Sequence, residues 1–290
     1  SSLPPAPRLV FVDGNYAPEH SNLQGAETLR IGTLGRALAG DDEAALSHLG
    51  HEFTDQEAPF ASLNTALATD GLLIEIPDRV TVTAPLHVVF VHSEDADGSH
   101  YLRHLMTCGE HSRLTVIEHH RGNGRGLSND FWQVRLKPHA HLQHIRVQDI
   151  GQAHTAFSRC DATIEQNAVY TRLDVDTGTH FLRHELNIAL QGRNALARSG
   201  GVLWADGSTT LDTRLTARHQ APDTTCELIW RGMADGKGKV NFYGGISIDA
   251  GADGSNAALS NKNLLLGRQA QINTQPALEI YADEVKAAHG

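Results

Sequence analysis

The sequence contains few cysteines and no long apolar run. Its three cysteines, Cys108, Cys160 and Cys226, are far apart and form no Cys-x-x-Cys pair. This scattered, odd-numbered set argues against a disulfide framework, a zinc ribbon or a standard iron–sulfur cage within the chain. It favours a reducing compartment, and we expect the cytoplasm. No apolar run approaches the roughly 20 residues of a membrane span, so we expect no membrane association.

Positive charge and nucleotide-binding signatures are also scarce. The 290 residues carry 24 Lys and Arg against 34 Asp and Glu, a formal net charge of −10. A protein that binds a nucleic-acid backbone needs a basic surface, so we expect no nucleic-acid partner. The segment GKGKV, residues 236–240, lacks the glycine spacing and the Ser or Thr of a P-loop. We therefore do not expect the chain itself to be an ATPase.

The first 70 residues mix strand and helix signals. Residues 8–16, RLVFVDGNY, alternate and then turn at an Asp-Gly pair, which predicts a short strand or hairpin. Two short helices are predicted next, and Pro59 and Gly71 mark the start and end of the second. The first helix is predicted from apolar residues that recur at helical spacing, namely Leu34, Leu38, Ala45 and Leu49. We therefore divide the chain into an N-terminal strand with short flanking helices, residues 1–70, and a core domain, residues 71–290.

Short strand-like runs with a regular period fill the core domain. Four runs share one form, in which two polar residues and a small residue precede an alternating segment. The small residues, spaced by 28, 28 and 27 positions, are Ser112, Ala140, Ala168 and Ala195, and weaker members follow at Gly238 and Ala270. Such a period, with two or three short strands in each unit, predicts an all-β core folded as a parallel β-helix. A sandwich built from hairpins remains the alternative.

One histidine pair raises the possibility of a metal site. His139 and His141 would point to the same face if both lay in one strand, and Glu118 could complete a facial triad with them. This reading would make the protein a cupin-like metalloenzyme with histidine ligands. A stripe of histidines facing solvent would have the same sequence pattern.

Catalytic carboxylates and nucleophiles are weakly indicated. Asp174 and Asp176 are the clearest same-face carboxylate pair, and we interpret them as a solvent-facing stretch of strand. A carbohydrate-active β-helix enzyme would need more acidic residues on one outer face. Ser199 does not lie in a nucleophile elbow, so Ser-His-Asp catalysis is not predicted.

Longer segments resemble a known family. They are RHELNIALQGRNALARSGGVLWADGSTTLDTRLTARHQAPDTTCELIWRGMADGKGKVNFYGGISI (183–248), LSNKNLLLGRQAQINTQPALEIYADEVKAAHG (259–290), FASLNTALATDG (60–71) and RLVFVDGNY (8–16). Together they resemble the SufB/SufD family of iron–sulfur cluster assembly scaffolds, and the last segment is similar to the SufD-type branch. The resemblance implies a right-handed parallel β-helix flanked by helical regions. It also implies a non-catalytic scaffold subunit of a SufBCD complex.

The resemblance also implies where the functional residues lie. His289, in the final His-Gly, resembles the histidine that the SufD branch offers to a cysteine and a glutamate of SufB, and it is a possible iron ligand. Cys226, in DTTCELIWRG, is a further candidate for the cluster-assembly interface. Ala287 stands where the family commonly has a cysteine. The residues expected at the partner edge are Glu279, Tyr281, Asp283 and Lys286.

The expected partners and cofactors follow from the same resemblance. We expect pairing with a SufB-type subunit at the end of the β-helix, or with a second copy of this chain to form a homodimer. A SufC ATPase would drive the assembly by docking on a C-terminal helical region, which we expect to be absent from this chain. We expect no cofactor to be held stably by the isolated chain, and a transient iron–sulfur cluster in the complex.

Overall fold

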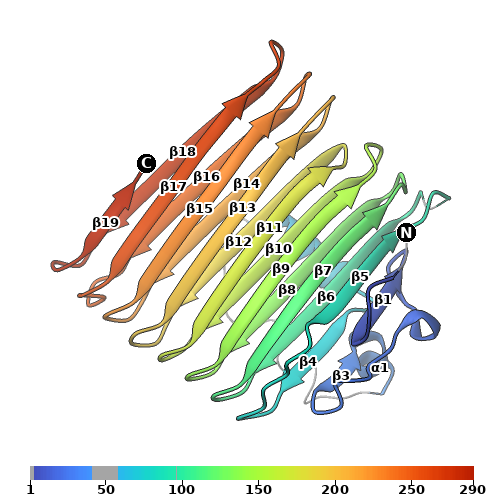
Figure 1. The fold of residues 1–290 in the computed structure, drawn as a ribbon, viewed down its shortest axis with the longest axis horizontal. Helices are drawn as coiled ribbons and strands as arrows, with labels where there is room; N and C mark the ends of the chain where they lie inside the picture. Colours follow the sequence, from blue (N-terminus) through green and yellow to red (C-terminus); the bar gives the residue numbers. More distant parts are fainter. Residues whose placement is uncertain (1–2, 41–57, 96) are drawn as a thin grey trace.

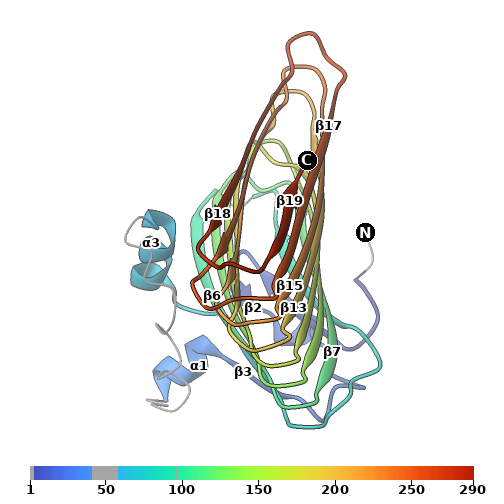
Figure 2. The ribbon, with the colours of Figure 1, turned by 90° about the vertical axis from the view of Figure 1, so that its left-hand side faces the viewer.

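The computed structural model describes residues 3–40, 58–95 and 97–290, and there the chain winds into a parallel β-solenoid of two facing sheets (Figures 1 and 2). Sheet A contains, in spatial order, β2 (Asn15–Tyr16), β1 (Arg8–Val12), β5 (Leu86–His92), β7 (Arg113–Gly122), β9 (His141–Ile150), β11 (Val169–Gly178), β13 (Leu196–Ala205), β15 (Thr225–Ala234), β17 (Asn256–Leu265) and β19 (Lys286–His289). Sheet B contains β3 (Arg30–Thr33), β4 (Leu72–Ile76), β6 (Ser99–Cys108), β8 (Leu127–Leu136), β10 (Thr155–Ile164), β12 (Phe181–Leu190), β14 (Thr210–His219), β16 (Lys239–Ile248) and β18 (Gln271–Ile280). The chain alternates between the sheets, so the predicted parallel β-helix is confirmed and the sandwich is excluded.

The N-terminal region lies at one end of the solenoid and along one side of it (Figure 2). It contains the short η1 (Pro18–His20), α1 (Leu34–Ala39) and α3 (Pro59–Leu67). The helix α3 lies against the outer face of sheet B, where the Asn64 side-chain amide donates to the carbonyl oxygens of Leu102 and Asn129 at 3.0 and 2.9 Å. The strand β1 pairs in parallel with β5, so it belongs to sheet A itself. Ala45 and Leu49, part of the first helix prediction, lie outside the described residues.

One corner of the solenoid explains the sequence period. Ser112, Ala140, Ala168 and Ala195 are all buried and each lies just before a strand of sheet A. The backbone carbonyl oxygen of each of these residues accepts a hydrogen bond from the first backbone N–H of the sheet A strand in the next coil. The four distances are 2.8 to 3.0 Å, and the donors are His141, Val169, Leu196 and Thr225. A small side chain is needed because the coils stack directly here. The predicted stacking of these four residues is confirmed.

The two weaker members of the repeat belong to a different corner. The turns that contain Gly238 and Ala270 lead into β16 and β18 of sheet B, not into sheet A. The backbone N–H of Gln271 donates to the carbonyl oxygen of Gly238 at 3.0 Å, so this second corner also stacks. Each coil has two main strands, which are ten residues long from β6 to β18, and a turn at each end. Gly238 and Ala270, the weaker members of the sequence repeat, therefore stack in a column separate from that of the four residues before sheet A.

Strand alternation divides the side chains between the interior and the outer faces. In β13 to β18 the inward positions are largely apolar, as with Leu203, Leu215 and Ile246. In β7 to β12 they also include ionisable residues, which are listed here: Glu118, Asp130, Arg146, Arg172, Asp174 and Asp176. No helix within the described parts of the chain is long and apolar enough to cross a membrane.

Candidate functional site

The last strand of the described residues, β19, follows β18 and returns to sheet A. β19 has only four residues and pairs with the first four residues of β17, from Asn256 to Leu259. The carbonyl oxygen of Gly290 accepts one more backbone hydrogen bond, from Asn261 at 2.7 Å, and the pairing then stops. Among the described residues β18 pairs only with β16, so its outer edge is open along all ten residues (Figure 1). Such an edge presents unpaired N–H and C=O groups that can pair with a strand from another chain.

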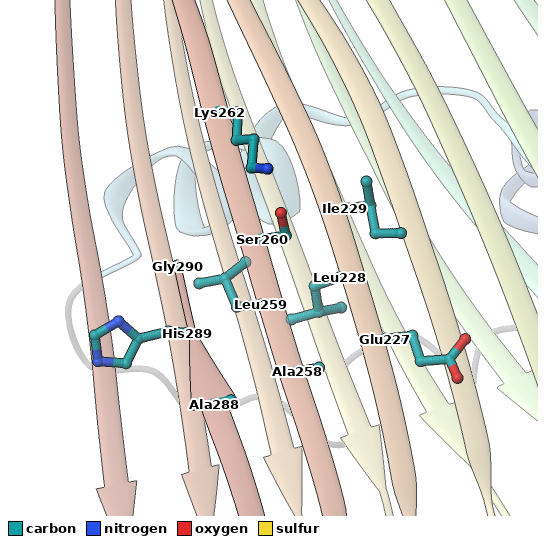
Figure 3. A pocket seen from close by; sticks show the side chains of 10 residues that line it. All are labelled: Glu227, Leu228, Ile229, Ala258, Leu259, Ser260, Lys262, Ala288, His289 and Gly290. Atoms are coloured by element: carbon teal, nitrogen blue, oxygen red, sulfur yellow. The ribbon is translucent and has the colours of Figure 1, made fainter.

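His289 lies at the end of the last described strand. It is the last residue of β19 and is in register with Leu259 of β17. Its imidazole is exposed, and none of the described residues forms a hydrogen bond or ion pair with it. Figure 3 shows the ring pointing away from the other labelled side chains. A neutral imidazole nitrogen in this position is free to bind a metal ion.

A shallow depression lies beside His289, where β19 stops short on β17 (Figure 3). Its volume is about 470 Å³, and its walls come from β15, β17 and β19. Glu227 on its rim is already paired with Arg198 at 3.0 Å, while Ile229 is 55 % exposed. The depression is open to solvent, and most of its surface is apolar. It therefore fits a contact with another protein surface better than the enclosure of a small molecule.

The residues predicted at the partner edge all lie in the terminal coil. Glu279 is near the end of β18, Lys286 opens β19, and Tyr281 and Asp283 lie in the turn between them. All four are exposed, and Tyr281 reaches 66 %. Exposed apolar side chains accompany them at both ends of the coil: Leu264, Leu265, Leu266 and Ile280. The terminal coil therefore combines an open backbone edge with apolar contact area.

Cys226 lies inside the solenoid, away from this surface. It points inward from β15, is only 1 % exposed, and is in register with Ala257 and, one strand further, Ala287. Its sulfur is 3.2 Å from Nε2 of His219. Burial raises the pKa of the thiol to about 12, so it is neutral at neutral pH. The structure does not bring Cys226 and His289 together, and two strands, about 10 Å, separate Cys226 from the edge.

The predicted histidine–carboxylate metal site is not formed. His139 is not in a strand: it occupies a turn with a φ of 62° and stacks on His111, with ring centroids 4.4 Å apart. His141 lies on the outer face of sheet A, whereas Glu118 points into the interior. Within the described residues no three His, Cys, Asp or Glu side chains are grouped to hold a metal ion. The metalloenzyme alternative is therefore not supported by the described residues, because His139 lies in a turn and Glu118 faces the opposite side of sheet A from His141.

Asp174 and Asp176 are also placed differently from the prediction. Both are fully buried and face the interior, so they are not a solvent-facing stretch. Arg172 binds Asp174 through Nε and Nη2, with the shorter contact at 2.7 Å, and Arg146 binds Asp176. Because Ala168 fixes the corner, every second residue from Tyr170 onward must point inward. This parity is a signal in the sequence that would have identified the pair as buried.

Glu118 is the centre of a buried network that the sequence analysis did not identify. Its carboxylate accepts from Nε2 of His144 at 2.5 Å, from Nε2 of His120 at 3.1 Å and from the Trp132 indole at 3.0 Å, and it contacts Arg172 at 3.2 Å. Burial alone would raise the pKa of Glu118. The histidine and arginine partners outweigh burial and hold this pKa well below its ordinary value. The carboxylate is therefore ionised and fully bonded inside the protein.

Comparison with known proteins identifies similar chains. Residues 90–290 match the family model "SUF system FeS cluster assembly, SufBD core domain", and residues 6–88 match "SufBD protein N-terminal region". The iron-sulfur cluster assembly protein SufD of Escherichia coli is 27% identical over 98% of this chain and 66% of its own length. An iron-sulfur cluster assembly SufBD family protein of Synechocystis is 28% identical, over 98% and 65%. The chloroplastic protein ABCI7 of Arabidopsis thaliana is 24% identical, over 80% and 51%. The chain thus spans about two thirds of the first two relatives and about half of the third.

Proposed function

The chain belongs to the SufBD family of iron–sulfur cluster assembly proteins, and from this premise we propose that it is a non-catalytic scaffold subunit. In this proposal it pairs with a SufB-type subunit through the open end of the solenoid. The observation that carries the proposal is the unpaired edge of β18 next to an exposed, unbonded His289. An assembly scaffold needs such a surface because the cluster must be built where two subunits meet and then released.

A shared site is favoured over a site within this chain. The described residues contain no group of three metal-ligating side chains, and Cys226 is buried as a neutral thiol. His289 can contribute one nitrogen ligand, so the remaining ligands would come from the partner, most usefully as thiolates, which iron–sulfur clusters prefer. Ala287, which points to the same side of β19, has no side chain that could bind a metal. The cluster in this proposal is cargo that the complex holds transiently.

The energy source is placed outside this chain. Because the sequence contains no P-loop, we assign ATP hydrolysis to a SufC-type subunit of the complex. The carbohydrate-active alternative has no observation in its favour, since Asp174 and Asp176 are inside the solenoid and bound to arginines. The localisation that fits this role is the cytoplasm, where thiols remain reduced.

The test uses the full-length protein in cells that depend on it. His289→Ala should still co-purify with the SufB-type subunit, but the activity of iron–sulfur enzymes should fall by about tenfold or more, as when a metal site loses a supporting group. The matched control is His141→Ala on the outer face of sheet A, which should complement as well as the parent protein.

Two outcomes would contradict the proposal. The site assignment is wrong if His289→Ala complements fully while His141→Ala fails. The partner assignment is wrong if the full-length protein purifies only with copies of itself and the cells still mature their iron–sulfur enzymes.

A further inference from the structure

Three histidines meet at one corner near the N-terminal end of the solenoid. His92 ends β5, His100 lies in β6, and His154 directly precedes β10, so the group joins both sheets. The ring centroids are 4.5 Å apart for His92 and His154, 5.1 Å for His92 and His100, and 6.4 Å for His100 and His154. His92 and His154 are buried and His100 is half-buried. These three residues form the histidine corner.

Few charged groups face the histidine corner. Among the described residues, they are Asp13, from the turn between β1 and β2, and the titratable His120 of β7, while His180 in the adjacent turn is exposed. The Asp13 carboxylate accepts from the backbone N–H of Ser93 at 2.8 Å and from its hydroxyl at 2.5 Å. His120 is bonded to Glu118 at 3.1 Å. Both nearby carboxylates therefore have partners, and no hydrogen bond among the described residues joins either to the corner.

A positive charge in the histidine corner is unfavourable, because the rings are buried and close together. Burial, and then the proximity of His154 and His100, lower the pKa of His92 to about 2. Burial lowers the pKa of His100 to about 4 although Asp13 acts in the opposite direction, and burial and then His100 lower the pKa of His154 to about 4.

These shifts link the stability of the corner to pH. An imidazole in an unfolded chain has a pKa near 6.5, so below about that pH the opened corner binds protons that the closed corner does not. The closed corner is therefore destabilised as the pH falls below about 6.5. Each histidine with a lowered pKa shifts the opening equilibrium by up to about tenfold for each pH unit.

The histidine corner also holds the N-terminal strands against the first coils. Ser93, which Asp13 binds, directly follows His92. A Cβ atom at Gly14 would lie 2.4 Å from Cβ of His100, so the turn between β1 and β2 packs tightly on this histidine. Opening the corner would therefore release this turn from β5 and β6.

We propose that His92, His100 and His154 form an acid-sensitive latch that closes the N-terminal end of the solenoid. Protons that enter the corner place like charges on neighbouring rings and separate the turn between β1 and β2 from β5 and β6. The latch and the open edge of β18 lie at opposite ends of the solenoid (Figure 1). Acid should thus loosen the N-terminal end first, independently of any partner subunit and of His289.

The test is hydrogen exchange of this chain at pH 7 and pH 5, with protection corrected for the intrinsic exchange rate at each pH. In the parent protein, protection of residues 8–16 and 86–92 should fall at least about tenfold more than that of residues 239–248. His92→Phe keeps an aromatic ring but removes one titrating group, and it should reduce this excess loss by about tenfold. The matched control is His111→Asn, an exposed histidine in a turn with φ of 57°, which should behave like the parent.

Three results would overturn the proposal. Equal loss of protection in the segments at both ends would show that acid unfolds the whole solenoid at once. Unchanged protection of residues 8–16 and 86–92 between the two pH values would show that the corner does not open. An undiminished excess loss in His92→Phe would show that groups outside the histidine corner cause the opening. If His92→Phe does not fold, His154→Asn, which keeps a polar side chain beside Ser128, takes its place in the same comparison.

Discussion

The coils from β7 to β12 and those from β13 to β18 share one backbone but have different interiors. Both sets consist of ten-residue strands stacked in one-to-one register around the same two corners. The first set encloses Glu118, Arg146 and Arg172 with their partners, whereas the second encloses mainly apolar residues such as Leu215 and Ile246. The corners and the alternation therefore determine the winding of the chain, and the chemistry of the interior can change from coil to coil.

A gain in folding stability does not explain why the coils from β7 to β12 enclose charged residues. Replacing a buried ion pair with apolar residues of similar volume is often neutral or stabilising, because desolvating two charges is costly. Removing one partner is strongly destabilising, because it leaves the other charge buried and unpaired. The ionic coils should therefore be more sensitive to substitution than the apolar coils, although they are no more stable.

The largest effect should follow from removing Glu118. Glu118→Ala leaves Arg172 and His144 without their shared carboxylate, and it should lower the free energy of unfolding by about 3–5 kcal/mol. Urea unfolding measures this loss. The control is Glu165→Ala, a more exposed partner of Arg135, for which a loss below about 1 kcal/mol is expected. Equal losses in the two variants would show that the ionic interior is not the more sensitive region.

The next effect is a dependence on pH that comes from Asp130. Burial, and then the negative charge of Glu118, raise the pKa of Asp130 to about 7. Between pH 4 and 7 the folded protein keeps a proton on Asp130 that the unfolded chain releases. This group therefore contributes stability that is lost as the pH rises.

Asp130→Asn removes this titration. The stability of the variant relative to the parent should increase with pH by about 1.4 kcal/mol for each unit in this window. Buried histidines away from Asp130 titrate in both proteins and cancel in the difference, whereas His120, whose Nδ1 lies 3.8 Å from Oδ2 of Asp130, also responds to the substitution. The measurement is urea unfolding of both proteins at several pH values, and a difference that stays constant from pH 4 to 7 would contradict the prediction.

A smaller effect is expected in the apolar coils. Ile246→Val removes one methylene group from a residue that is 3 % exposed, and it should cost about 0.5–1.5 kcal/mol. The midpoint of urea unfolding should shift with an unchanged slope. A loss as large as that of Glu118→Ala would mean that the two regions respond alike.

The smallest effect on folding is expected at the open end. His289→Ala should change the free energy of unfolding by no more than about 0.5 kcal/mol, because the imidazole is exposed and unbonded. The same urea titration measures it. A loss above about 2 kcal/mol would show that His289 supports the terminal coil, and a failure to form clusters would then no longer identify a ligand.

Much of the winding could be predicted from the sequence, because Ser112, Ala140, Ala168 and Ala195 stack directly and tolerate only small side chains. The sequence predicts a solvent-facing stretch at Asp174 and Asp176 because charged residues on a strand usually face water. Only the corner position, not local composition, shows that they point inward. The sequence gives no sign of the turn at His139, because this residue adopts a φ of 62° and the turn contains no glycine.

The stacking of Gly238 and Ala270 in a second corner was missed for a related reason. The period of the repeat shows how often a corner recurs, but it does not distinguish the two corners of one coil. At the candidate site, the sequence places His289 near the end of the last strand. Which part of β17 is covered by β19 depends on the register of the two strands, which is a property of the pairing and not of any one residue.

Within the described residues, β19 covers only Asn256–Leu259 of β17, and this pairing gives the edge of sheet A the form of a step. Where β19 covers β17, sheet A extends one strand further, about 4.8 Å, than where β17 is uncovered. His289 lies at the boundary between the two parts. A flat end would accept a second subunit at many angles around the long axis. In the proposed assembly, a surface complementary to this step would dock at one angle, and the register of β19 on β17 would set which part of that surface meets the imidazole of His289.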